Sequence, residues 1–313
     1  MQNRVREIDY LKCVFIILMV MFHLVYVGDK YPYAKQMVYT FHMPAFLLIS
    51  GYLANMAKSP GRMLNQLKWL FIPYAVMEAG YVIAASVLPI REHIDCLTVT
   101  LFMEKLLLHP LGPYWYLHTL IVCYIIYYAV SRLRPRLGTV PLMCVLGVAF
   151  YAVVELTHIV QMSNAMYFMA GALVRQSGMK FMQVFRPSLL AAVPIAIFCM
   201  ASPGEMYKQT LTGVIVTYLA ISLALGTCRK LPEKALRAAC FIGSNTLAVL
   251  LFSPMFTILA KRFVPLFAFD PTASLYTVFS VAFVLAGSLA VAYAMDRLNL
   301  SRWFSGKSLY NHA

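Results

Sequence analysis

Residues 9 to 23 read DYLKCVFIILMVMFH, an apolar run with charges near its start and an imidazole at its end. The run suits a lipid bilayer, in which burying Asp9, Lys12 and His23 costs free energy, so these residues are expected to have a function. At 100° per residue, Lys12 and His23 are separated by roughly three turns and about 16 Å of rise. The ammonium and the imidazole are therefore expected on one helical face at different depths.

The composition of the whole chain agrees with a membrane location for this stretch. The chain has 313 residues, of which 61% are hydrophobic and 12% are charged, and its mean hydropathy is +0.73. Soluble domains have about 25% charged residues. One span needs about 20 apolar residues, so the chain has room for about ten spans joined by short loops. We predict an all-α polytopic transmembrane helix bundle that forms one domain over residues 1–313.

The expected spans follow the apolar runs. They lie near residues 10–28, 37–56, 69–89, 114–131, 139–157, 164–175, 187–201, 208–227, 237–259 and 272–295. Residues 90–113 are amphipathic and either lie in the outer interface or enter the fold.

The distribution of charge sets the predicted orientation. Most of the 26 Lys and Arg residues fall in segments that are cytoplasmic if the N-terminus is inside, as the positive-inside rule requires. Both termini are then cytoplasmic, and the protein is expected as a multi-pass protein of the inner (plasma) membrane. Basic loops beside anionic membrane lipids explain the net charge of +14 without a nucleic-acid partner.

His23 and His42 are the first candidates for chemistry. Imidazole accepts a proton near neutral pH, and the segment YTFHMPAFLLISGYL (39–53) places His42 at a depth similar to that of His23. Core histidines bonded to a neighbouring helix are the simpler interpretation. A metal site is disfavoured because no H-x-x-x-H pair occurs and the seven cysteines are scattered. In the same segment, Pro44 and Ser50-Gly51 indicate kinking and helix packing.

Further candidates lie at the outer ends of later spans. Trp115 and Tyr116 in GPYWYLHTLI (112–121) either anchor the helix in the interface or form an aromatic wall for a sugar ring. His118 lies one turn deeper, and Glu155 is near the outer end of the fifth span. Both are candidates for the lining of a polar cavity, although an outer helix end in water explains them equally.

Cations gather at the predicted inner mouth of the first three spans. The positive-inside rule explains these cations, and their charge also suits them to bind phosphates. They are Lys12, Lys58, Arg62 and Lys68. Lys12 is the most specific of them because it lies inside the apolar run, where Asp9 offers a partner three residues earlier.

With these residues in view, the chain resembles the membrane-bound acyltransferase 3 family over essentially its whole length. The resemblance rests on Lys12-x10-His23, on Phe41-His42-Met43-Pro44 and on Ile49-Ser50-Gly51-Tyr52. Weaker support comes from Trp115-Tyr116-Leu117, Phe168-Met169-Ala170-Gly171 and Ile242-Gly243-Ser244-Asn245-Thr246.

The resemblance implies transfer of an acetyl or other acyl group from acyl-CoA to a hydroxyl of an extracytoplasmic or lipid-linked glycan. It implies His23 as the catalytic residue, with Lys12 as its basic partner. It implies acyl-CoA as the donor substrate and no tightly bound cofactor. We expect the donor phosphates near Lys12, Arg62 and Lys68, and oxyanion stabilisation by His42 or Ser253.

Two departures from the family pattern concern the donor and the acceptor. The R-x-x-R of the family is not intact in GRMLNQLKWLFIPY (61–74), and Phe252-Ser253-Pro254 stands where many members have a histidine before proline.

A different class of protein is the alternative, namely a proton-coupled transporter or flippase for a lipid-linked sugar or small anion. The chain shows neither an internal repeat nor paired broken helices, which such a transporter would favour.

Overall fold

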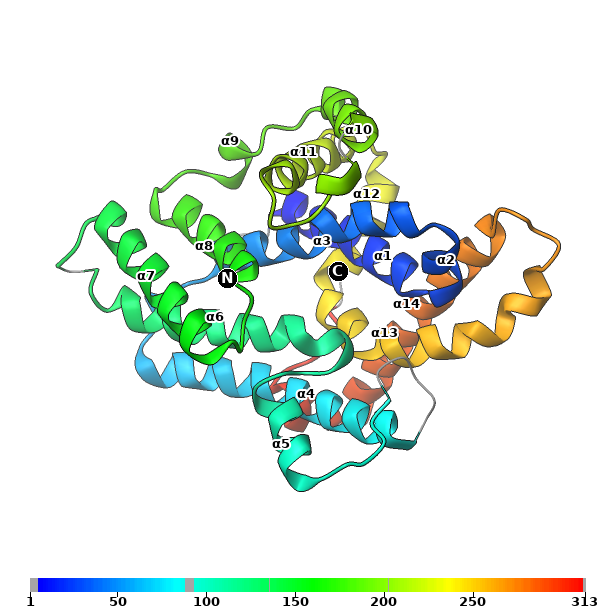
Figure 1. Ribbon diagram of the computed structural model, residues 1–313, viewed down its shortest axis with the longest axis horizontal. Helices are drawn as coiled ribbons and strands as arrows, with labels where there is room; N and C mark the ends of the chain where they lie inside the picture. The colour runs from blue at the N-terminus through cyan, green and yellow to red at the C-terminus, as the bar shows by residue number, and fades with distance from the viewer. Residues whose placement is uncertain (1–4, 88–92, 135, 202, 312–313) are drawn as a thin grey trace.

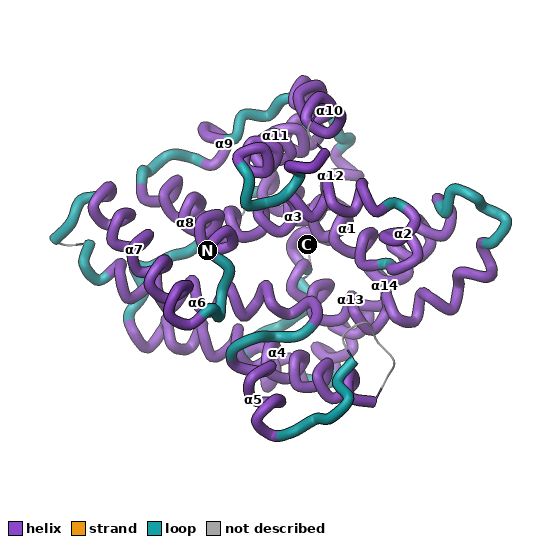
Figure 2. Tube along the Cα trace, in the orientation of Figure 1, coloured by secondary structure: helices purple, strands orange, loops and turns teal. Residues whose placement is uncertain are grey.

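The fold is all-α in the part of the chain that the structure describes. The computed structural model describes residues 5–87, 93–134, 136–201 and 203–311, and no strand occurs in these ranges (Figures 1 and 2). The helices are α1 (Arg6–His23), α2 (Val25–Lys30), α3 (Pro32–Leu53), α4 (Pro60–Val87), α5 (Val99–Leu107), α6 (Trp115–Ser131), α7 (Thr139–Thr157), α8 (Met162–Gln176), α9 (Phe181–Val184), α10 (Ala192–Ala201), α11 (Leu211–Cys228), α12 (Glu233–Ser244), α13 (Thr246–Ala260), α14 (Ser274–Arg297) and α15 (Leu300–Ser305). Short 3₁₀ turns cover Gly112–Tyr114, Leu189–Ala191, Pro203–Glu205 and Lys261–Phe267.

Helix α1 occupies the centre of the bundle. It contacts α3, α11, α12, α13 and α14, and Figure 1 shows α1 and α3 between the group α6, α7 and α8 and the pair α13 and α14. Leu11 and Val20 are fully buried along it. The stretch that opens the sequence is therefore surrounded by protein on several sides, so its charged residues face other helices.

Helices α3 and α8 cross at a pair of glycines. A Cβ atom on Gly51 would lie 2.0 Å from the Phe168 carbonyl oxygen, and one on Gly171 would lie 1.9 Å from the Leu48 carbonyl oxygen. Only glycine at both positions allows the two backbones to approach so closely. The interpretation of Ser50-Gly51 as a packing feature agrees with this contact.

Outward-facing side chains on several helices are apolar. Val140, Val148 and Leu156 on α7, and Leu275 and Val278 on α14, are all more than half exposed. Exposed apolar faces of this extent fit lipid as the surrounding medium. Six helical stretches among the described residues are long and apolar enough to cross a membrane: 60–87, 99–131, 139–157, 211–228, 246–267 and 274–297. The count of ten spans and the sides of the termini stay predictions.

Four predicted spans differ clearly from the helices found. The first helix ends at His23 because Leu24 is extended, and α2 follows as a separate helix. The apolar run 187–201 contains only the ten residues of α10 after a 3₁₀ turn. The run 208–227 becomes helical only at Leu211, which leaves Lys208 in a loop.

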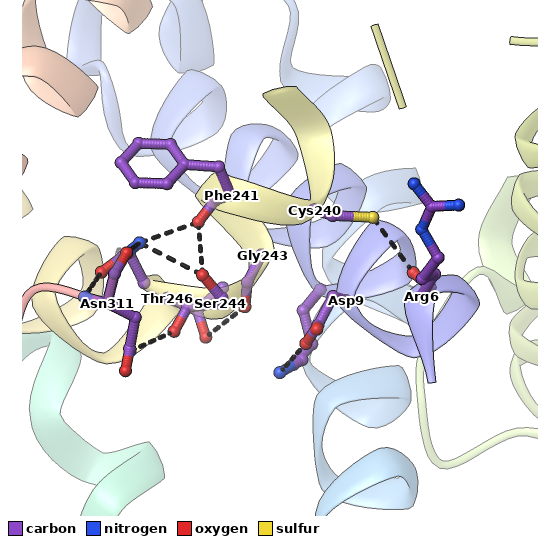
Figure 3. Close-up of polar contacts among 10 residues, drawn as sticks. Arg6, Asp9, Cys240, Phe241, Gly243, Ser244, Thr246 and Asn311 are labelled. Atoms are coloured by element: carbon purple, nitrogen blue, oxygen red, sulfur yellow. Dashed lines mark hydrogen bonds and ion pairs between the residues drawn. The ribbon is translucent and has the colours of Figure 1, made fainter. Parts of the chain in front are cut away.

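The predicted span 237–259 is two helices, broken at Asn245. The amide of Asn245 exchanges hydrogen bonds with the backbone of Asn311, and Asn311 Nδ2 donates to the Ser244 carbonyl oxygen at 2.9 Å (Figure 3). These bonds satisfy the polar groups at the break and tie the C-terminal segment to it.

The amphipathic stretch contains α5, which packs on the bundle. Leu97 and Leu101 pack against a small buried cluster that includes Val82 of α4. The Tyr74 hydroxyl donates to the Leu106 carbonyl oxygen at 2.8 Å. The stretch is thus held against α4, and its residues 90–92 lie outside the described part of the chain.

Candidate active site

His23 and His42 each make the same hydrogen bond to the backbone of their own helix. Each ring places Nδ1 2.7 Å from the carbonyl oxygen four residues earlier, Met19 for His23 and Val38 for His42. A carbonyl oxygen only accepts hydrogen bonds, so Nδ1 carries the proton and Nε2 of the neutral ring carries the lone pair. Nε2 of His42 is buried and has no hydrogen-bond partner among the described residues.

Tyr39 lies between the two imidazoles. Its ring centroid is 5.8 Å from that of His23 and 5.1 Å from that of His42. Lys35 lies over the same tyrosine ring at 5.7 Å. Positions 35, 39 and 42 recur at helical spacing, so one face of α3 carries a lysine, a tyrosine and a histidine.

The two histidines line one cavity of about 450 Å³, here called the outer cavity. The predicted residue Trp115 lines it too. Tyr39, Lys35 and Lys208 also line it, and the sequence did not predict them there. The two lysines were explained only as charges in outer loops. The helical spacing of Lys35 and Tyr39 from His42 was an available signal. Nothing local to Lys208 indicated its position, because the loop before α11 brings it there.

The other predicted outer residues are divided among neighbouring cavities. Ser253 lines a cavity of about 290 Å³ that His23 also lines, here the serine cavity. His118 lines a cavity of about 560 Å³ that shares Trp115 and Lys208 with the outer cavity, here the side cavity. Glu155 is exposed on α7 and lines none of the cavities described.

Lys12 lines a smaller cavity of about 170 Å³, here the inner cavity. Its Nζ is 2.6 Å from the Asp9 carboxylate, and both side chains are largely buried. Figure 3 shows Asp9 beside α12, where Gly243 lies against the Asp9 backbone. The predicted residue Tyr116 belongs to this cavity, and its hydroxyl is 2.8 Å from Ser50 Oγ.

Three side chains line both the inner and the outer cavity: Met19, Met43 and Leu250. The two cavities therefore adjoin, with flexible thioether side chains at their junction. Lys12 lines the inner cavity and His23 the outer cavity, so the two side chains lie on either side of this junction.

The remaining predicted phosphate-binding cations lie outside the inner cavity. Arg62 and Lys68 are exposed on the first turns of α4, and Lys68 Nζ lies 4.8 Å from the Trp69 ring centroid. A separate cavity of about 650 Å³, the arginine cavity, is lined by Arg132, Arg134 and Arg175. Its position was not anticipated, because the three arginines come from the ends of two different helices.

The described residues contain no group of three or more His, Cys, Asp or Glu side chains placed to hold a metal ion. The chemistry available in the outer and serine cavities is that of imidazole, hydroxyl, ammonium and amide groups, with one carboxylate, Asp29, in the serine cavity. Such groups accept and donate protons and stabilise charge at a reacting carbonyl.

The structure is a helical bundle with apolar outer faces, in which a histidine-lined cavity adjoins a second, lysine-lined cavity. The family model for the acyltransferase domain of the acyltransferase 3 family matches residues 5–295, and the chain belongs to that family. No curated protein and no solved structure matches the chain. The resemblance seen in the sequence is confirmed, and the roles of individual residues are proposals.

Proposed function

We propose that this protein transfers an acetyl or other short acyl group from cytoplasmic acyl-CoA to a hydroxyl of an extracytoplasmic or lipid-linked glycan. The observation that carries the proposal is the pair of adjoining cavities, with Lys12 lining one and His23 lining the other. A donor entering from the inner end and an acceptor entering from the outer end then meet at His23.

His23 acts as the general base in this proposal. Its Nε2 removes the proton of the acceptor hydroxyl while that oxygen attacks the thioester carbonyl. The new carbon–oxygen bond forms, the carbon–sulfur bond breaks, and the proton passes from His23 to the departing sulfur of CoA. A relay through acyl-histidine is the second route, and it differs by a covalent adduct on His23 that intact-protein mass spectrometry detects.

Ser253 and His42 take different parts in this reaction. Ser253 has a hydroxyl that can donate to the developing oxyanion, and it shares a cavity with His23. His42 has its proton on Nδ1, bound to Val38, so its neutral Nε2 only accepts. We therefore assign His42 to binding an acceptor hydroxyl rather than to oxyanion stabilisation.

The central experiment compares wild-type protein with His23→Ala. Surface glycans of cells expressing each form are analysed by mass spectrometry, and consumption of acyl-CoA is measured with purified protein in lipid nanodiscs. Loss of the base is expected to lower transfer by roughly 10²- to 10⁴-fold. His93→Ala, in an exposed loop, is the matched control. Undiminished transfer by folded His23→Ala protein would end this assignment.

The same preparation separates acyl transfer from transport. A transferase is stabilised thermally by CoA, because a ligand that binds only the folded state raises the unfolding temperature. A transporter or flippase for a lipid-linked sugar or small anion is expected to be indifferent to CoA. An unchanged unfolding temperature at millimolar CoA, together with no consumption of acyl-CoA, favours the transporter.

The donor phosphates are expected at Lys12, Arg62 and Lys68. Paired variants test this location against the arginine cavity: Arg62→Gln with Lys68→Gln, and Arg134→Gln with Arg175→Gln. Phosphate contacts bind acyl-CoA equally in the ground state and the transition state, so their loss raises KM for acyl-CoA more than it lowers kcat. If only the second pair raises KM, the donor phosphates bind in the arginine cavity.

A further inference from the structure

Lys208 lies in a loop that three helices hold in place. The Met206 carbonyl oxygen accepts a hydrogen bond from Thr40 Oγ1 at 2.6 Å, and the Lys208 carbonyl oxygen accepts one from the Tyr167 hydroxyl at 2.8 Å. A Cβ atom on Gly213 would lie 1.9 Å from the Tyr207 carbonyl oxygen. The start of α11 therefore packs directly on this loop, and the position of Lys208 is defined by α3, α8 and α11.

The ammonium of Lys208 has only neutral partners. Nζ donates to Asn164 Oδ1 at 2.8 Å and lies 5.2 Å from the Trp115 ring centroid. Within the described part of the chain, no carboxylate lies within ion-pair distance of it. Burial lowers the pKa of Lys208 to about 8. A half-buried cation without a counter-charge is unfavourable, and an anionic ligand would offset that cost.

The cavities on both sides of Lys208 carry the same sign of charge. Lys208 and Trp115 line the outer cavity and the side cavity alike. Neither cavity has Asp or Glu among the described residues that line it. Their other cationic or titratable groups are Lys35, His23, His42, Tyr39, Tyr207, Lys105, His109, His118 and His158. Of the nearby carboxylates, Glu205 accepts from Thr212 at 3.1 Å, Glu104 lies 4.0 Å from Lys105 Nζ, and Asp29 lines the serine cavity, in which Lys208 takes no part.

We propose that the acceptor is an acidic glycan, whose carboxylate or phosphate group binds Lys208 while an adjacent sugar ring lies on Trp115. The glycan extends from the outer cavity into the side cavity, and the hydroxyl to be acylated reaches His23. This inference rests on the proposed acyl transfer and adds the charge of the acceptor. Lys208 is the central contact because it belongs to both cavities.

The first test identifies the acylated product. Surface glycans from cells with wild-type protein and with His23→Ala are separated into acidic and neutral fractions, and the acyl group is mapped by mass spectrometry. An acyl group on a uronic acid or phosphorylated sugar, or on its direct neighbour, supports the inference. An acyl group on an uncharged glycan with no acidic neighbour overturns it but keeps the acyltransferase. No difference between the strains overturns the proposed function itself.

Mapping also separates the two sources of negative charge. If the acidic group is a carboxylate, the acyl group is found in a glycan that contains uronic acid. A phosphate source places it on a phosphorylated sugar or on the first sugar of a lipid-linked intermediate.

The second test removes the charge of Lys208. Lys208→Met is expected to lower acylation at least tenfold, whereas Lys208→Arg retains it and Lys30→Met, an exposed outer lysine, changes nothing. Unfolding temperatures verify that the variants are folded. Equal acylation by folded Lys208→Met protein would overturn the role of Lys208.

The pH dependence of acylation distinguishes a lysine that binds an anion from a lysine with only a structural role. Lys208 is charged below about pH 8 and loses its proton above it, so anion binding by wild-type protein weakens as the pH rises from 8 to 9.5. Above its pKa, the charged fraction of a group falls about tenfold per pH unit. Lys208→Arg stays charged, and its acylation is expected not to fall in this range. All other titratable groups of the cavities are common to both proteins, so parallel profiles would contradict the proposal.

Discussion

A histidine whose Nδ1 is bonded to the carbonyl four residues earlier keeps its Nε2 unprotonated while the ring is neutral. His23 and His42 both have this bond, which uses only their own helix. The tautomer of each ring is therefore decided locally, before any contact with another helix. For His23 it leaves the nitrogen that a general base needs, and for His42 it leaves an acceptor.

At the residue scale, Asp9 and Lys12 are expected to behave as a coupled pair. Removing one member of a largely buried ion pair leaves the other charge without compensation. We expect Asp9→Asn alone to lower the free energy of unfolding by about 1–3 kcal/mol, and less when Lys12→Met is present. A double-mutant cycle on urea or thermal unfolding in detergent measures the coupling. Additive effects of the two substitutions would show that the pair contributes nothing to stability.

At the scale of elements, the junction of the inner and outer cavities is the narrow part of the proposed route. Met19 on α1 and Met43 on α3 line both cavities. A large rigid side chain there fills the junction, whereas leucine has a volume close to that of methionine.

We therefore expect Met19→Trp to lower acyl transfer at least tenfold while CoA still raises the unfolding temperature. Met19→Leu is the matched control and is expected to keep most of the activity. Transfer and thermal stabilisation are measured on the same nanodisc preparation. Full activity of folded Met19→Trp protein would mean that acyl groups do not pass this junction.

The crossing of α3 and α8 is the second prediction at this scale. A methyl group at Gly171 meets the Leu48 carbonyl oxygen at 1.9 Å, so Gly171→Ala forces the helices apart. Overpacking of this kind costs about 1–3 kcal/mol. Gly80→Ala is the control because nothing lies within 4 Å of a Cβ there, and alanine favours the helix. Thermal unfolding should rank Gly171→Ala below wild type and Gly80→Ala at or above it; the reverse order would contradict the close crossing.

At the scale of the whole molecule, orientation follows from charge and can be tested by labelling. Cys96 is exposed before α5, in a segment predicted to be outside, and Ser177 is exposed just after α8, in a segment predicted to be inside. A membrane-impermeant maleimide should label Cys96 in intact cells. With Cys96→Ser and Ser177→Cys combined, labelling should require permeabilised cells. Labelling of the second protein in intact cells would reverse the predicted topology.

The sequence alone was enough to predict the helical membrane bundle, the family and the face shared by Lys12 and His23. The bundle and the shared face depend on local quantities, namely the length of an apolar run and the 3.6-residue period of the helix, whereas the family was indicated by the resemblance of short motifs. The same information placed helix ends less well. The breaks at Leu24 and Asn245 interrupt apolar runs, and the second is satisfied by Asn311, which is distant in the chain.

Only the tertiary structure decided which side chains share a cavity. Glu155 and His118 looked equally suited to a polar cavity, yet Glu155 is exposed while His118 lines the side cavity. Lys208 reaches Trp115 and Asn164 because three helices hold its loop. Contacts between distant segments depend on how whole helices pack, and the periodicity of any one helix carries no information about its neighbours.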